Sequence, residues 1–101
     1  MYPKNSGVHM SEDLDNLSIS YEENGIEVVK ELDKAILSKG AWATVIFRYQ
    51  DWDRRKETYS DDKYSIRRYK KMAGIYRQQS KFNISSKAQA EKLIEVLRRW
   101  L

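Results

Sequence analysis

Hydrophobic and polar positions alternate most clearly in the middle of the chain. Residues 42–52 read WATVIFRYQDW, a run rich in β-branched and aromatic side chains. Because successive side chains of a strand point to opposite faces, Val45, Phe47 and Tyr49 share one face and Arg48 lies on the other. The pattern therefore predicts a half-buried strand with Arg48 on the opposite side from its apolar residues.

Two further alternating stretches, residues 63–71 and 75–85, are separated by Met-Ala-Gly. Gly74 accepts a positive φ at no steric cost, so this short break predicts a hairpin turn. In the second stretch we expect Phe82 and Ile84 to point toward the core. The ten polar residues between 53 and 62 predict a loop before this hairpin.

The ends of the predicted domain differ in how clearly they can be interpreted. Residues 26–38 fit both a helix and a strand, because their apolar positions satisfy either period. The last segment is a helix: Ser86 and Gln89 have capping-box spacing. Its apolar side chains recur at helical intervals and are Ala90, Leu93, Ile94, Leu97, Trp100 and Leu101. The order is therefore ββββα or, if residues 26–38 are helical, αβββα, as in double-stranded-RNA-binding domains.

The length of 101 residues allows one compact domain, and the charge is unevenly distributed along it. Residues 1–25 carry one base and five acids, a net −4, whereas residues 26–101 carry 18 bases and ten acids, a net +8. We therefore expect residues 1–25 to be a disordered acidic tail, which could include a cloning remnant, and residues 26–101 to be the folded domain.

Composition also limits the possible chemistry. The chain has no cysteine, and His9 is its single histidine, so we expect no metal site, no cofactor and no catalytic residues. The carboxylate pairs Asp51/Asp53 and Asp61/Asp62 are more typical of turns than of Mg²⁺ sites. No apolar run is long enough for a membrane helix. We expect a non-enzymatic cytoplasmic protein, associated with the nucleoid if the source is bacterial.

The strongest charge signal lies between residues 63 and 81, which contain seven bases and no acid. Tyr64, Tyr69 and Tyr76 are interspersed among those bases. Cations bind phosphates and aromatic rings stack on unpaired bases, so this mixture suits single-stranded nucleic acid. A solvated basic face with tyrosines packed beneath it is the alternative interpretation.

Interpreted as four strands and a helix, the sequence resembles the bacterial members of the positive-cofactor-four family of transcriptional coactivators. The resemblance covers residues 26–101 and is carried by IEVVKELDKAILSKGAW, KYSIR, SKFNIS and EKLIEVL. Its most specific part is the aromatic–x–Ile–Arg–x–aromatic stretch formed by Tyr64, Ile66, Arg67 and Tyr69. The family is similar in fold to the Whirly proteins, which bind single-stranded DNA. The resemblance implies an α+β fold in which a four-stranded curved antiparallel sheet precedes a C-terminal helix, assembled as a homodimer.

The same resemblance implies roles for individual residues. Arg67 and Arg48 would be the strand arginines that meet DNA, and Tyr69 or Lys70 would hold the position of a base-stacking aromatic. The chain departs from the family after Lys81, where Phe82 replaces the usual glycine. The family's helices build much of the dimer interface, which here implies Leu93, Leu97, Trp100 and Leu101.

Alternation and position add three residues to the expected nucleic-acid site. Arg77 and Lys81 are expected to share one face and contact phosphate, and Trp52 could stack on a base at the rim of the sheet. Since Ile66 is taken as a core residue, Arg67 is expected to face outward.

The expected function is binding of single-stranded DNA, or RNA, by a dimer with little sequence preference, in transcriptional regulation or in protection of single strands. Two alternatives stay open: an αβββα domain that binds double-stranded RNA, and a dimeric protein-interaction module without a nucleic-acid ligand.

Overall fold

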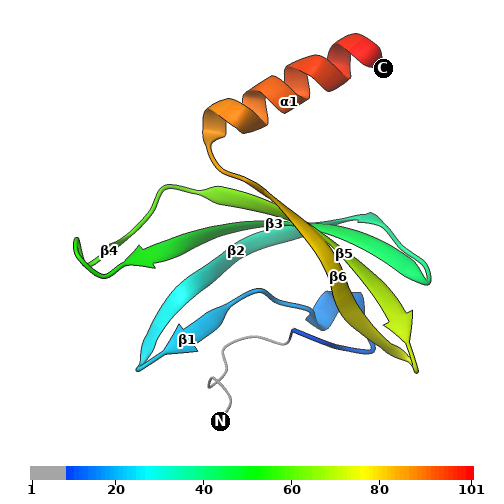
Figure 1. Cartoon of the computed structure of the whole chain (residues 1–101), viewed down its shortest axis with the longest axis horizontal. Helices are drawn as coiled ribbons and strands as arrows, with labels where there is room; N and C mark the ends of the chain where they lie inside the picture. Colours follow the sequence, from blue (N-terminus) through cyan, green and yellow to red (C-terminus); the bar gives the residue numbers. More distant parts are fainter. Residues whose placement is uncertain (1–8) are drawn as a thin grey trace.

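The computed structural model describes residues 9–101, which form a curled antiparallel sheet followed by one helix (Figure 1). The strands are β1 (Tyr21–Glu23), β2 (Ile26–Ser38), β3 (Trp42–Asp53), β4 (Thr58–Tyr59), β5 (Lys63–Met72) and β6 (Ile75–Ile84), and the helix is α1 (Lys87–Trp100). Their order in the sheet is β1-β2-β3-β5-β6, and β4 pairs with the end of β3. The predicted sheet-plus-helix fold is confirmed, with β1 and β4 in addition to the four predicted strands.

Residues 26–38 form a strand along their whole length. β2 pairs with β1 on one side and with β3 on the other, both antiparallel. The ladder to β3 contains two register irregularities, between Glu31 and Asp33 and between Ile36 and Ser38. Such bulges bend a strand, and they interrupt the simple alternation that would have marked this segment as a strand in the sequence. The αβββα arrangement is therefore wrong.

The core lies on the inner face of the curl, the face that carries the buried side chains of β3. Ala43, Val45 and Phe47 are fully buried there, in agreement with the predicted apolar face of this strand. Tyr69 of β5 and Tyr76 of β6 complete the same cluster. The opposite face of the sheet is called the outer face below.

The segment before β1 closes this core. Leu14, Leu17 and Ile19 are almost fully buried in the cluster, and the chain runs along the inner side of the sheet (Figure 1). The ammonium group of Lys34 holds the segment in place by donating to three backbone carbonyls, those of Leu14, Asp15 and Leu17, at 3.0, 2.7 and 2.6 Å. The expectation of a disordered tail is therefore wrong for residues 9–25, and residues 1–8 lie outside the described part of the chain.

A bulge in β6 decides which face each of its cations occupies. Arg68 pairs with Ser80 but Tyr69 pairs with Gln78, so Gln79 is an extra residue without an opposite partner. The extra residue reverses the alternation along β6. Arg77 consequently lies on the outer face and Lys81 on the inner face, and the expectation that they share a face is wrong.

The turn between β5 and β6 explains the tightness of this hairpin. Ala73 and Gly74 both have positive φ angles, 52° and 80°, as a two-residue type I′ turn requires. Gly74 adopts this conformation freely, whereas the alanine does so at a steric cost.

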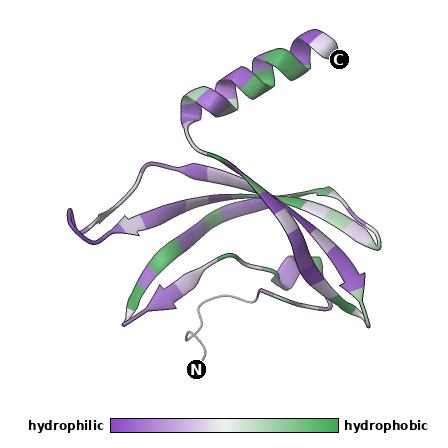
Figure 2. Cartoon of the chain, viewed as in Figure 1, coloured by the Kyte–Doolittle hydropathy of each residue, from purple (hydrophilic) through white to green (hydrophobic). Residues whose placement is uncertain are grey.

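The helix is well capped but poorly covered. Ser86 accepts a hydrogen bond from the backbone N–H of Gln89 at 3.1 Å, as its capping-box spacing predicts. None of the helix residues is buried, and Leu97 and Trp100 are 43% and 77% exposed. Figure 2 shows the apolar stripe along α1, which projects away from the sheet. Within residues 9–101, no helix has the length and apolar character needed to cross a membrane.

On the sheet, Phe82 is 55% exposed, so the expectation that it points into the core is wrong. It pairs with the half-buried Ile66 on the outer face. Ile84 is buried, but it lies on the outer face and outside the inner-face cluster.

Replacing Leu17 tests whether the N-terminal segment belongs to the core. Leu17→Ala is expected to lower the free energy of unfolding by about 2–5 kcal/mol, because it leaves a cavity in a packed cluster. Urea unfolding measures this change. Leu37→Ala, at a side chain that is 57% exposed, is the control and should change stability by less than about 0.5 kcal/mol. Equal midpoints for both variants would contradict the packing of this segment.

Candidate nucleic-acid interface

The seven residues expected to bind nucleic acid do not form one surface. The cross-strand pair Arg67 and Lys81 lies on the inner face of the β5–β6 hairpin. A second pair, Lys70 and Arg77, lies on its outer face. The other three are Arg48, Trp52 and Tyr69, and each has a different environment. The structure therefore brings together two pairs of cations rather than one continuous row.

Tyr69 is a core residue and not a surface aromatic. Only 1% of it is exposed, and it pairs with Ala43 of β3 inside the inner-face cluster. Burial raises the pKa of its phenol, and the nearby Arg67 opposes this shift. The prediction that Tyr69 stacks on a base is wrong in this structure, because no base could reach its ring without opening the core.

Arg67 faces inward, so the expectation that it points away from the core is also wrong. It lies opposite Val45, while Ile66 lies on the outer face. The half-buried guanidinium donates from Nε to the Ser65 hydroxyl at 3.2 Å and from Nη1 to the Gln78 side-chain oxygen at 3.0 Å. These neutral partners hold the group in place and leave its charge available to an anion.

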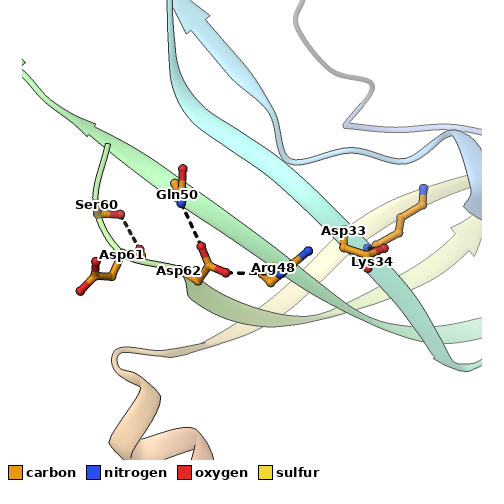
Figure 3. Close-up of polar contacts among 7 residues, drawn as sticks. All are labelled: Asp33, Lys34, Arg48, Gln50, Ser60, Asp61 and Asp62. Atoms are coloured by element: carbon orange, nitrogen blue, oxygen red, sulfur yellow. Dashed lines mark hydrogen bonds and ion pairs between the residues drawn. The ribbon is translucent and has the colours of Figure 1, made fainter. Parts of the chain in front are cut away.

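Arg48 lies on the outer face as expected but is already paired (Figure 3). Its Nη1 is 3.4 Å from a carboxylate oxygen of Asp62. The other oxygen of Asp62 accepts a hydrogen bond from Gln50 at 2.9 Å. An acid held this close reduces the attraction of Arg48 for phosphate, so this position is a weaker candidate than the hairpin cations.

Trp52 is packed rather than open. Its ring meets Tyr59 edge to face, with centroids 5.0 Å apart. Asp51 lies beside it and accepts from the ammonium of Lys63 at 2.8 Å. This hydrogen bond raises the pKa of Lys63.

The acids near this end of the sheet serve local structure. Asp53 accepts from the backbone N–H groups of Arg55 and Lys56 at 2.9 and 3.1 Å, as a turn-forming aspartate does. Across residues 9–101, no group of three histidine or acidic side chains is arranged to hold a metal ion.

A fourth aromatic, Trp42 at the start of β3, carries only a weak signal in the sequence. Its ring lies 4.5 Å from the guanidinium carbon of Arg68 and 5.3 Å from the ammonium of Lys70, both within cation–π range. Trp42 is the cross-strand partner of Lys70. The sequence signal is the alternation that places Arg68 and Lys70 on one face of β5. This alternation points to Trp42 only once the pairing of β5 with β3 is known.

The hairpin as a whole is strongly basic. Of its seven cations, only Lys63 forms an ion pair within the described residues. Residues 1–8 contain no acid that could pair with the rest. The six others are Arg67, Arg68, Lys70, Lys71, Arg77 and Lys81. The hairpin lies at the edge of the sheet, where residues 78–83 of β6 are all exposed and, among the described residues, no strand pairs with them on their free side.

Comparisons with protein-family models, curated proteins and solved structures found no match to this chain.

The ionisation of Tyr69 tests its burial. Tyr49 and Tyr69 are expected to ionise above the ordinary tyrosine value of 10.0, because burial raises both pKa values. Each phenol therefore contributes stability that is complete below pH 10.0 and is lost as the pH rises through the raised pKa. A phenolate absorbance titration should show Tyr69→Phe losing a late-titrating group. Loss of an early group from Tyr69→Phe would contradict the burial.

Proposed function

We propose that this chain is a non-enzymatic protein that binds single-stranded nucleic acid, DNA in the first place, through the β5–β6 hairpin. The observation that carries the proposal is the run of six unpaired cations on an exposed edge hairpin. Cations without carboxylate partners bind phosphates and release counterions, which gives affinity with little sequence preference. The resemblance to coactivators that bind single-stranded DNA supports the same ligand and suggests a role in transcription or in strand protection.

The placement of the cations favours a single strand over a duplex. Arg67 and Lys81 lie on the inner face of the hairpin, and Lys70 and Arg77 on the outer face. A flexible single strand can cross the free edge of β6 and contact both pairs. A duplex is stiff over about 150 base pairs, so it would meet only one face of this edge.

We further propose that the protein acts as a homodimer in which α1 covers apolar surface of a second copy. A 14-residue helix is marginal without tertiary packing, yet no residue of α1 is buried. The same chain carries a second, partly exposed apolar surface on the outer face of the sheet, where the half-buried Ile66 and the exposed Phe82 form a cross-strand pair. Every copy of the chain carries both surfaces. In a two-fold symmetric dimer, α1 of each protomer can therefore pack on the outer face of its partner's sheet.

Nucleic-acid binding should depend on the hairpin cations. The protein is expected to bind labelled oligo-dT of about 20 nucleotides more tightly than duplex DNA or RNA of the same length. In the Arg67→Ala/Lys81→Ala variant, the slope of log K against log salt should fall by about 0.7 for each phosphate that is no longer neutralised. Fluorescence anisotropy over a salt series measures both quantities.

The matched control is Arg55→Ala/Lys56→Ala, which removes two exposed cations from the turn before β4 and should leave the slope unchanged. Equal slopes in both double variants would mean that Arg67 and Lys81 of the hairpin do not contact the nucleic acid. Weak and equal binding of all three nucleic acids would instead favour a protein partner.

The molar mass of the protein in solution tests whether it forms the proposed dimer. Light scattering should give twice the chain mass of 12.0 kDa for the wild type and the single-chain mass for Leu97→Glu, because a carboxylate would be placed in an apolar contact. Ala88→Glu is the control: it lies about two and a half turns earlier, on the opposite side of α1, and should stay dimeric. A monomeric wild type would contradict this assembly.

A further inference from the structure

One end of the outer face carries an aromatic ring surrounded by cations. The β2–β3 and β5–β6 turns both lie at this end, away from the point where α1 leaves the sheet (Figure 1). Trp42 begins β3 here and pairs with Lys70 of β5. Lys70 in turn pairs with Arg77 of β6. Three strands therefore contribute to one cluster, which we call the Trp42 cluster: Trp42, Arg68, Lys70 and Arg77.

The ring of Trp42 is accessible as well as supported. Its relative exposure is 43%, which is high for so large an apolar side chain. Arg68 and Lys70 lie against the ring at 4.5 and 5.3 Å, so they hold the indole while remaining at the surface. Among the described residues, no carboxylate forms an ion pair with any cation of the cluster.

The backbone that carries Trp42 is fixed from the neighbouring strands. The hydroxyl of Tyr76, a buried residue of β6, donates to the carbonyl of Gly40 at 2.7 Å. The backbone N–H of Lys71 donates to the carbonyl of Ala41, also at 2.7 Å. Both contacts tie the β2–β3 turn to the hairpin, so the indole is presented from a positioned backbone rather than a loose loop.

Three other exposed or rim aromatics, Trp52, Phe82 and Trp100, lack this combination. Trp52 is packed edge to face on Tyr59 and has Asp51 and Asp53 as its chain neighbours. Phe82 and Trp100 are more exposed than Trp42, but they belong to the apolar surfaces that the proposed dimer would cover. Trp42 alone among these four combines an accessible ring with contacts to cations that have no acid partner.

We infer that the Trp42 cluster is a base-stacking site, an inference that rests on the proposed function. A base of single-stranded nucleic acid stacks on the indole of Trp42, and the neighbouring phosphates bind Arg68, Lys70 and Arg77. Stacking on an indole accepts every base, because each base has a π-face. The platform aromatic is therefore Trp42 of β3, in place of the buried Tyr69 and the packed Trp52.

The test compares three variants by anisotropy with labelled oligo-dT. Trp42→Ala should weaken binding about 5-fold to 150-fold, the range expected for the loss of one aromatic–base stack. Trp42→Phe should retain part of the affinity, because a smaller ring still stacks. Trp52→Ala should change affinity less than about twofold. Circular dichroism of each variant establishes that the sheet is intact.

A second measurement separates stacking from charge. A fully abasic oligonucleotide keeps the phosphates but has no bases to stack, so the wild type and Trp42→Ala should bind it equally. In addition, oligo-dT should quench the tryptophan fluorescence of Trp52→Phe but not that of Trp42→Phe.

The outcomes distinguish the stacking role of Trp42 from the proposed binding of single-stranded nucleic acid by the hairpin. Oligo-dT binding that is equal in the wild type and Trp42→Ala would overturn the stacking site while leaving the hairpin as the binding element. A wild type that does not bind oligo-dT would overturn both. An affinity loss that persists in full on the abasic strand would mean that Trp42 acts only by positioning its cations, and would also overturn the stacking role.

Discussion

The packing of Leu14, Leu17 and Ile19 against the inner face of the curled sheet is the contact on which the rest of the structure depends. A curled single sheet has no second layer of its own, so the apolar side chains of β3 need a cover from elsewhere in the chain. The N-terminal segment supplies that cover, and the Lys34 ammonium fixes it through three carbonyl oxygens. Because this contact fills the curl, the aromatic side chains within it cannot serve as a binding surface. The proposed ligand contacts therefore lie on the outer face and at the β5–β6 edge, where Arg67 and Lys81 are on the inner face.

The bulge at Gln79 then decides how the cations are distributed. In a regular ladder, Arg77 and Lys81 would share one face. With one extra residue in β6, Lys81 pairs with Arg67 on the inner face and Arg77 pairs with Lys70 on the outer face. The edge strand becomes basic on both sides, an arrangement that fits a flexible polyanion and also discourages edge-to-edge pairing with another sheet.

The regular parts of this fold could be predicted from the sequence, because local pattern determines them. The strand of residues 42–52, the hairpin with Gly74 and the capped helix at Ser86 all follow from alternation, turn chemistry and capping. The core role of residues 14–19 could not be predicted, since three apolar side chains among acids carry no periodic signal. The sheet faces on which Arg67 and Lys81 lie could not be predicted either, because the strand register and the bulge depend on pairing between distant segments. The Trp42 cluster was missed for the same reason, because its members come from three strands.

The two proposed surfaces are compatible because they occupy different parts of the same face. The apolar pair Ile66 and Phe82 lies on β5 and β6 toward the end from which α1 leaves, whereas Trp42 lies at the end where the two hairpins turn. A second copy seated on this pair would leave the Trp42 cluster open in each protomer. A dimer would then present two basic hairpins from one particle. Linking two sites raises the effective concentration of the second once the first is bound, so a long single strand would be held more tightly than either hairpin could hold it alone. On this view the exposed stripe of α1 serves binding indirectly, by setting the distance between the two sites that one strand must span.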